Sequence, residues 1–330
     1  MCTAITLQSR QHENFFGRTM DFSYDIEPYL YVVPKNYAWT NVITMNTIHD
    51  CYSFMGIGQE SQGMLGFFDG VNEHGFAAAA LYFAGYASYD TNTNCKEKEY
   101  IPSLDFLHYM LGQCGSVKEL VKRLPNISIV GFPDPVTQIA APLHWMATDK
   151  SGECIVVEQT ENGLQCFQNP IGVMANSPDF PWHLTNLRNY IELSQTQTGE
   201  ACWGQFPLRP FGQAGGTMLL PGGYTSPERF VRTAYQKTHI ELPKSRSETI
   251  VACFHLVESV SIPKGLVITD RGTYDYTKYT AFVNTTTCEY FFRTYNKNQI
   301  TSASLWDYYK HSKELICLGK ITEPVAFEKM

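Results

Sequence analysis

The chain has 330 residues, a formal net charge of −7 and a hydrophobic fraction of 44%. This length allows one large β-rich domain or two smaller domains, and because no long linker interrupts the sequence we expect a single domain over residues 1–330. The acidic balance and the scattered lysines and arginines argue against nucleic acid as a partner.

No stretch of the chain approaches the ~18 apolar residues of a membrane span. The first residues also lack a cationic region followed by a continuous apolar core, which is the pattern of an export signal. We therefore expect a cytoplasmic protein without a membrane partner.

Strand-like runs dominate the first part of the chain. Apolar patterns predict strands at 3–8, 14–19, 29–34, 51–57, 65–69 and 75–83. The first two runs are expected to pair as a hairpin, because only a short turn separates them. The last run is small and apolar on both faces, which predicts a position in the closely packed centre of a sheet.

Two helices are predicted next. The first covers 102–113, where Pro102 suits the first turn and apolar residues recur on one face. The second begins at Ser116, which forms a capping-box pattern with Glu119, and it ends before Pro125.

The second half of the chain again places strands before helices. Strands are predicted at 143–148, 154–159, 164–168 and 172–175, helices at 182–193, 227–239 and 247–260, and a last hairpin at 279–286 and 288–295. The tail after residue 300 is expected to be less regular. This order favours an α+β fold in which two antiparallel sheets pack face to face and helices cover their outer sides.

The predicted helix at 227–239 carries an arginine in an unusual position. Ser226 is the expected cap and Pro227 the expected first helical residue, which places Arg229 in the opening turn. Because a cation there opposes the helix dipole, Arg229 is expected to face an acid or an oxyanion.

Ten cysteines are spread along the chain. None forms a Cys-x-x-Cys pair, and no Cys/His cluster has zinc-finger spacing, so the sequence indicates no metal site, no dithiol redox site and no cofactor. Without an export signal the cysteines are expected to be free thiols, most of them buried.

Cys2 is the candidate nucleophile. Once the initiator methionine is removed, this residue carries a thiol and a free α-amine, which are a nucleophile and a base on one residue. Such groups ordinarily have pKa values of about 8.5 and about 8, so neither needs a distant histidine near neutral pH. A cysteine beside an initiator methionine is weak evidence for a nucleophile by itself. The interpretation therefore depends on the residues that the fold brings next to Cys2.

The predicted hairpin can return Arg18 and Asp21 to the side of Cys2. A cation beside the sulfur favours the thiolate, which is the reactive form, and Asp21 can accept a hydrogen bond from the α-amine. The alternative is that Arg18 and Asp21 form a salt bridge on the surface of a sheet.

Several motifs in this order together resemble the choloylglycine hydrolase family, which comprises penicillin V acylases and conjugated bile salt hydrolases. The motifs are Cys2 and the segments 17–21, 72–75, 176–180, 220–223 and 229–232. The resemblance runs through about residue 300 and implies the four-layer αββα fold of N-terminal nucleophile hydrolases. Members usually assemble as tetramers, so a homotetramer is expected here.

The resemblance also implies hydrolysis of a non-peptide carbon–nitrogen amide bond, with a small N-acyl amide as the partner. The thiol attacks the carbonyl, an acyl-thioester forms, and water releases it. The matched catalytic positions are Cys2, Arg18, Asp21, Tyr82, Asn176 and Arg229. In the family, the side-chain amide matched by Asn176 and the backbone N–H at the position of Tyr82 bind the oxyanion. Met20 and Tyr82 match positions that bind the acyl group.

Tyr82 bears on the choice of substrate. Bile salt hydrolases typically carry asparagine at this position and penicillin V acylases tyrosine, and an aromatic ring suits an aryloxyacetyl group. The resemblance therefore favours a penicillin V acylase, which forms 6-aminopenicillanic acid and phenoxyacetate. The alternatives are a conjugated bile salt hydrolase or an acylase of other N-acyl amides such as acyl-homoserine lactones, and Tyr82 could also be a core residue. The loops around 58–65 and 131–142 are expected to set specificity.

Other classes of protein fit less well. A serine hydrolase would carry Gly-x-Ser-x-Gly at a strand-to-helix turn, which this chain lacks. A papain-like enzyme would need a histidine near its cysteine, which no local motif indicates. A non-catalytic binding protein of the same fold would keep Cys2, Arg18 and Asn176 only by coincidence, and Cys2→Ser separates the two hypotheses, because only an enzyme would lose hydrolysis.

Overall fold

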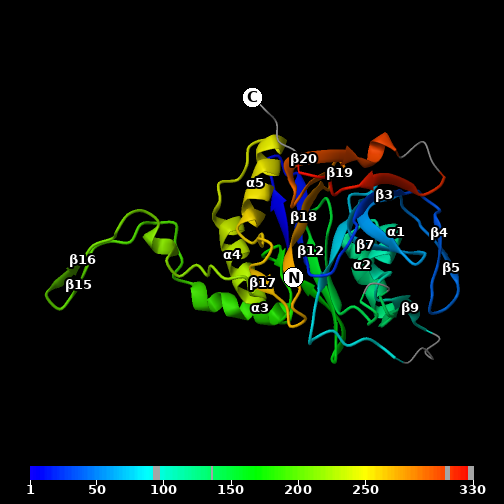
Figure 1. The fold of residues 1–330 in the computed structure, drawn as a ribbon, viewed down its shortest axis with the longest axis horizontal. Helices are drawn as coiled ribbons and strands as arrows, with labels where there is room; N and C mark the ends of the chain where they lie inside the picture. Colours follow the sequence, from blue (N-terminus) through cyan, green and yellow to red (C-terminus); the bar gives the residue numbers. More distant parts are fainter. Residues whose placement is uncertain (92–96, 135–136, 309–312, 326–330) are drawn as a thin grey trace.

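A computed structural model describes residues 1–91, 97–134, 137–308 and 313–325. Two large antiparallel sheets pack face to face, and helices lie on their outer sides, so the chain forms four layers (Figure 1). The predicted α+β sandwich of the αββα type is therefore confirmed.

The first sheet has the strand order β14-β1-β2-β18-β19-β20, with β17 paired to β18. Its strands are β1 (Cys2–Gln8), β2 (Asn14–Phe22), β14 (Val173–Met174), β17 (Val267–Ile268), β18 (Tyr274–Asn284), β19 (Glu289–Thr294) and β20 (Lys297–Ser304). The predicted hairpin is confirmed, because β1 and β2 pair with Cys2 opposite Met20 and Ala4 opposite Arg18. This register places the candidate nucleophile and its arginine on neighbouring strands.

The second sheet has the strand order β13-β12-β11-β8-β7-β6-β3-β21. Its strands are β3 (Tyr29–Val33), β6 (Phe54–Ser61), β7 (Met64–Asn72), β8 (Ala77–Tyr82), β11 (Leu143–Thr148), β12 (Cys154–Thr160), β13 (Gly163–Gln168) and β21 (Ile316–Lys320). Strand β8 lies between β7 and β11, which confirms the central position predicted for the run at 75–83. Tyr82 ends this strand.

The helical layers cover opposite sides of the sandwich, with α4 and α5 against the first sheet and α1 against the second. The helices are α1 (Phe106–Gln113), α2 (Val117–Arg123), α3 (Phe180–Asn186), α4 (Ser226–His239) and α5 (Arg246–Glu258). Ser116 caps α2 as predicted, because its hydroxyl oxygen accepts from the N–H of Glu119 at 3.2 Å. In the described parts of the chain, no helix is long and apolar enough to cross a membrane.

The helix predicted to start at Pro102 begins four residues later. Pro102 ends strand β9 (Glu99–Pro102), which pairs in parallel with β10 (Ile127–Val130). This pairing keeps the backbone extended through Pro102, so α1 starts only at Phe106.

Two other helix boundaries also differ from the prediction. Thr225, not Ser226, precedes α4, and its N–H and hydroxyl donate to the carboxylate of Glu228 at 3.3 and 2.6 Å. The helix predicted at 182–193 is the shorter α3, which passes into a 3₁₀ turn at Leu187–Tyr190.

The tail after residue 300 is more regular than predicted. Strand β20 pairs with β19 in the first sheet, and β21 pairs with β3 in the second. Both lie at the ends of their sheets, and most of their residues are partly or fully exposed, so they lack the apolar pattern of central strands. Their place in the sheets is set by pairing with distant strands.

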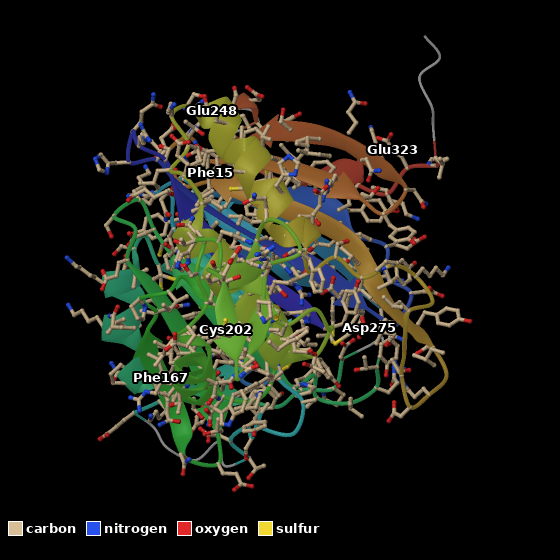
Figure 2. All side chains as sticks on the ribbon, turned by 90° about the vertical axis from the view of Figure 1, so that its left-hand side faces the viewer. Phe15, Phe167, Cys202, Glu248, Asp275 and Glu323 are labelled. Atoms are coloured by element: carbon tan, nitrogen blue, oxygen red, sulfur yellow. The ribbon has the colours of Figure 1, made fainter. Side chains whose placement is uncertain are left out.

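The segment between α3 and α4 leaves the layered body as an arm (Figure 1). It carries the short hairpin of β15 (Ala201–Trp203) and β16 (Phe206–Leu208), and Cys202 of this hairpin lies on the side that faces the viewer in Figure 2. Large apolar side chains on the arm are strongly exposed, namely Trp203, Phe206, Phe211, Met218 and Leu219. The arm therefore presents an apolar surface that the body of the same chain does not cover.

Gly75 is a position where packing excludes any side chain. It turns the chain between β7 and β8 with a φ of 78°, and a Cβ atom there would overlap the carbonyl oxygen of Thr285. We expect Gly75→Ala to lower the free energy of unfolding by about 3 kcal/mol, because left-handed strain and a backbone clash add. Urea unfolding measures this loss.

The matched control is Gly163→Ala in the turn between β12 and β13. Gly163 has a φ of 86°, but no neighbouring atom lies within 4 Å of the position that a Cβ atom would take, so only the backbone strain applies. We expect a loss of about 1 kcal/mol there. Equal losses for the two variants would contradict the packing argument.

Candidate active site

Cys2 and Arg18 meet between the two sheets. Nη2 of Arg18 lies 2.5 Å from the sulfur of Cys2 and 3.0 Å from the sulfur of Met20, which projects from β2 on the same side as Arg18. Cys2 is 3% exposed and Arg18 1% exposed. A guanidinium held against a buried sulfur stabilises the thiolate over the thiol, so the predicted partnership of these residues is present in the structure.

The remaining donors of Arg18 bind backbone carbonyls from both sheets. Its Nε donates to the carbonyl of Thr19 at 3.1 Å, and its Nη1 donates to Phe68 in β7 at 3.1 Å and to Ala80 in β8 at 2.7 Å. These bonds use the rigid fork of the guanidinium and fix its direction. Arg18 therefore joins the two sheets at the point where Cys2 begins the first one.

Asp69 in β7 is a buried acid whose charge acts on Arg18. The hydroxyls of Tyr279 and Tyr290 donate to Asp69 at 2.6 and 2.7 Å. Burial raises the pKa of Asp69, and Arg18 acts in the opposite direction. Burial also opposes the charge on Arg18, but the negative charges of Cys2, Tyr279 and Asp69 raise the pKa of Arg18 above its usual value.

Asp69 was not among the residues predicted for the site. The signal that could have found it is an acid within an otherwise apolar strand run, Phe67-Phe68-Asp69-Gly70-Val71, because an aspartate is rarely buried unless it has partners. The two tyrosines that bind it lie more than 200 residues away in sequence, so no local motif connects them.

Asp21 lies beside Cys2 as predicted, but its carboxylate has different partners. Thr277 donates to Asp21 Oδ1 at 2.6 Å, and Thr19 donates to Oδ2 at 3.0 Å. Burial raises the pKa of this carboxyl, while Arg229 lowers it. The predicted bond to this carboxylate comes from the free α-amine of Cys2, which does not exist while Met1 precedes Cys2, so it stays a prediction.

The chain carries Met1 ahead of Cys2, so the nitrogen of Cys2 is an amide. The ammonium group of Met1 donates to the carbonyl of Asp21 at 2.7 Å and pairs with the carboxylate of Asp275 at 3.0 Å. The N–H of Asp21 donates to the carbonyl of Met1 at 3.0 Å. The backbone of Asp21 thus holds the residue that precedes the candidate nucleophile.

Asn176 joins three of the predicted residues. Its Oδ1 accepts from the N–H of Cys2 at 2.7 Å and from Nη2 of Arg229 at 2.6 Å, and its Nδ2 donates to the carbonyl of Tyr82 at 2.7 Å. These partners fix the orientation of the amide, because two donors face its oxygen and a carbonyl faces its nitrogen. The Tyr82 carbonyl uses one of the two N–H bonds of this amide.

Arg229 is fully buried beneath Cys2. Its Nη1 donates to the carbonyl of Cys2 and to the hydroxyl of Thr3, and its Nε donates to the carbonyl of Tyr224 at 3.0 Å. Burial lowers the pKa of Arg229, and the negative charge of Asp21 counteracts this effect. In the described part of the chain, Arg229 forms no ion pair with an acid. Its direct contacts are oxygen atoms around Cys2, and Asp21 acts on it only through its charge.

His183 in α3 was not predicted, yet it contacts the backbone of Asn176. Its Nε2 lies 2.8 Å from the carbonyl oxygen of Asn176, and its ring stacks on Phe230. Burial lowers the pKa of His183 to about 4, so the neutral ring donates this hydrogen bond at neutral pH. His183 therefore helps to hold the segment that carries Asn176.

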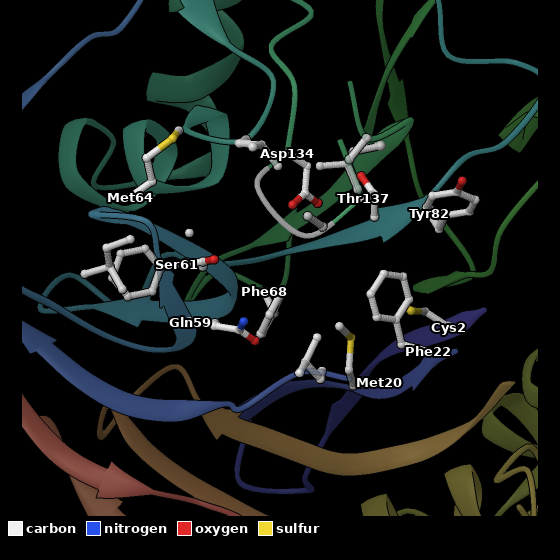
Figure 3. Close-up of a pocket in the computed structure, with 18 of the residues that line it drawn as sticks. Cys2, Met20, Phe22, Gln59, Ser61, Met64, Phe68, Tyr82, Asp134 and Thr137 are labelled. Carbon is white, nitrogen blue, oxygen red and sulfur yellow. The ribbon is translucent and has the colours of Figure 1, made fainter. Parts of the chain in front are cut away.

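An apolar cleft opens at Cys2 (Figure 3). Its space, with the open solvent at its mouth included, is about 970 Å³, and most of its lining is apolar. Both predicted acyl-binding residues, Met20 and Tyr82, line it. The two predicted specificity loops line it too, through Gln59, Ser61, Met64 and Leu65 and through Asp134, Thr137 and Ala141. Residues 135–136 of the second loop lie outside the described residues.

The structure brings the six predicted catalytic residues and Met20 to one end of this cleft. No group of three histidine, cysteine, aspartate or glutamate residues in the described ranges is arranged to hold a metal ion. The site offers a thiol, two buried arginines and an amide.

Comparison with known proteins identifies the family. The model for linear amide C–N hydrolases of the choloylglycine hydrolase family matches residues 2–318. The chain belongs to the choloylglycine hydrolase family. It is therefore an enzyme that hydrolyses carbon–nitrogen bonds in linear amides, with the fold of the N-terminal nucleophile hydrolases.

Three relatives of this hydrolase bear on its substrate. The bile salt hydrolase/transferase of Clostridium perfringens is 33% identical over 92% of both chains. The crystal structure of the C2A mutant of conjugated bile acid hydrolase from Clostridium perfringens has a TM-score of 0.92 and 30% identity, and the match covers 100% of this chain and 99% of that one. The penicillin V acylase of Pectobacterium atrosepticum is 24% identical, and the match covers 84% of this chain and 73% of the acylase.

Arg18→Leu tests the contact between the guanidinium and the sulfur of this hydrolase. Without a cation 2.5 Å away, Cys2 should form less thiolate at neutral pH. We expect iodoacetamide to alkylate Cys2 at least about tenfold more slowly in the variant. Mass spectrometry of the N-terminal peptide separates Cys2 from the exposed cysteines.

The control is Arg246→Leu, which removes an arginine that pairs with Glu13 and Glu289 at the surface. This variant should leave the alkylation rate of Cys2 unchanged. An unchanged rate in Arg18→Leu would instead mean that the buried cation does not govern the reactivity of the sulfur.

Proposed function

We propose that this hydrolase cleaves the amide bond of conjugated bile salts. The observation that carries the proposal is the large apolar cleft that ends at Cys2, because a steroid is a large, rigid and mainly apolar acyl group. The similarity to bile salt hydrolases over more than nine tenths of the chain supports it. This substrate was the alternative in the sequence analysis, and the comparisons favour it over penicillin V.

Penicillin V remains the second candidate substrate, because the ring of Tyr82 lines the cleft. An aromatic side chain there can stack on a phenoxy group. Against this, the relative named penicillin V acylase is less similar to this chain than the relatives named bile salt hydrolases. Acyl-homoserine lactones and other N-acyl amides have no specific support in the cleft.

In the proposed mechanism, Cys2 acts after the removal of Met1. The freed α-amine takes the proton of the thiol, and the guanidinium of Arg18, 2.5 Å from the sulfur, stabilises the thiolate. The thiolate attacks the carbonyl carbon of the substrate and forms a tetrahedral oxyanion. Met20, whose sulfur also contacts Arg18, forms the wall against which the acyl group packs.

The oxyanion is stabilised by Nδ2 of Asn176 and the backbone N–H of Tyr82. The bond from Asn176 to the carbonyl of Tyr82, together with the bond from Arg229, supports this role, because it fixes the amide before the substrate arrives. The ammonium form of the Cys2 amine then protonates the leaving nitrogen, the carbon–nitrogen bond breaks, and an acyl-thioester remains. Water, deprotonated by the same amine, attacks the thioester and releases the acid. The carbonyl oxygen of Asp21 lies 3.8 Å from the sulfur of Cys2, so Asp21 is placed beside this residue.

The substrate is tested by hydrolysis of glycocholate and penicillin V by the methionine-processed enzyme. We expect glycocholate to be cleaved with a kcat/KM at least about tenfold above that of penicillin V, because a steroid buries more apolar surface in an apolar cleft than a phenoxy group does. Cys2→Ala should abolish both reactions. The reverse preference would reject the bile salt proposal and restore the interpretation of Tyr82 as a mark of penicillin V acylase.

We also propose that the enzyme is a homotetramer, assembled through the arm between α3 and α4. The exposed Trp203 and Phe211 support self-association, because a contiguous apolar surface of this kind is normally covered in a stable oligomer. A second copy of the same chain is the simplest partner for this apolar surface, since it carries an identical arm.

The double variant Trp203→Ser and Phe211→Ser tests this assembly. We expect light scattering after gel filtration to give four times the chain mass for the native enzyme and a smaller mass for the variant, because the apolar contact is lost. Val121→Ser, which changes an exposed apolar residue on α2, should leave the mass unchanged. A monomeric native enzyme would reject the proposal outright.

We propose a cytoplasmic location because the described cysteines form no disulfides. The nine cysteines that the structure describes are all free. Free thiols in this number suit a reducing compartment, whereas an oxidising one favours disulfides.

A further inference from the structure

Asp105 is one of two acids, with Asp134, in a cleft whose lining is otherwise mainly apolar. It directly precedes α1, which packs on the outer side of the second sheet, whereas Cys2 begins the first sheet. The two residues therefore reach the same cleft from different layers of the sandwich.

The carboxylate of Asp105 has no hydrogen bond or ion pair within the described parts of the chain. An aspartate before a helix usually accepts from the first turn, but this requires an extended backbone. Asp105 has helical angles, φ −89° and ψ −7°, and makes no side-chain bond to the helix. Its oxygens are thus left for another donor.

The surroundings of Asp105 change the pKa of its carboxyl group. Burial raises the pKa of Asp105 to about 6, and His108 on the same helix acts in the opposite direction. At neutral pH the group is largely ionised, half-buried and without a donor. A half-buried acceptor of this kind is stabilised when a ligand supplies a hydrogen bond.

We propose that Asp105 determines specificity by accepting a hydrogen bond from a hydroxyl group on the acyl part of the substrate. The inference deepens the proposed function and rests on it, since the steroid of a bile salt carries hydroxyl groups on an apolar body. A phenoxyacetyl group carries no such donor. A site built to bind a hydroxyl group discriminates strongly against the analogue that lacks it, because the polar group of the site is then left unpaired.

The test measures binding instead of hydrolysis. Isothermal titration of the Cys2→Ala enzyme with cholate and with 5β-cholanate, the steroid acid without hydroxyl groups, is compared with the same titrations after Asp105→Leu. We expect Asp105→Leu to weaken cholate binding about tenfold and to leave 5β-cholanate binding equal or tighter. Asp105→Asn keeps one carbonyl acceptor and should weaken cholate binding about threefold, which also tests the inference if the leucine variant does not fold.

A matched control removes a carboxylate elsewhere. Glu161→Leu changes an exposed acid in the turn between β12 and β13 and should alter neither affinity. An equal effect of Asp105→Leu on both steroids, or no binding of cholate at all, would overturn the inference. If cholate binding depends on Asp105 but the processed enzyme does not hydrolyse glycocholate, the proposed function fails while the role of Asp105 as a hydroxyl acceptor stands.

Discussion

The site depends on one contact, that between the guanidinium of Arg18 and the sulfur of Cys2. A charge as buried as that of Arg18 is unfavourable by several kcal/mol unless hydrogen bonds and opposite charges replace water around it. Carbonyl groups from both sheets supply the hydrogen bonds, so the charge is tolerated only where the sheets face each other. The four-layer fold is therefore a condition for the reactive sulfur, not only a support for it.

The buried acids near this contact are arranged so that they do not compete with the sulfur. Each oxygen of Asp69 accepts from a tyrosine hydroxyl, and each oxygen of Asp21 accepts from a threonine hydroxyl. In the described ranges, neither carboxylate forms an ion pair with Arg18. The acids thus lower the free energy of the buried cation from a distance, while its direct ligands remain carbonyl oxygens and sulfur. Because neutral hydroxyl groups bind the carboxylates, the acids act on Arg18 only through their charge and leave its N–H groups to the carbonyls and the sulfur.

The sequence predicted the features that local patterns determine. The hairpin that returns Arg18 to Cys2 follows from two short apolar runs. The cap at Ser116 follows from the pattern of Ser116 with Glu119 three residues later. Asp69 and its tyrosines could not be predicted, because their contact depends on the packing of strands from distant parts of the chain. Residue chemistry alone singles out Cys2, Arg18, Asp21 and Arg229, and the resemblance adds Tyr82 and Asn176. These six residues lie together in the structure, while their individual roles and the single domain over 1–330 stay predictions.

Position 82 shows why a residue type at a catalytic position does not by itself decide the substrate. Asn176 contacts the backbone carbonyl of Tyr82, and any residue supplies that carbonyl. The side chain of Tyr82 consequently has no part in this hydrogen bond and lines the cleft, where its ring is one of many apolar groups. The other residues that line the cleft, Asp105 among them, also constrain the acyl group. Residue 82 alone therefore does not decide between a steroid and a phenoxy group.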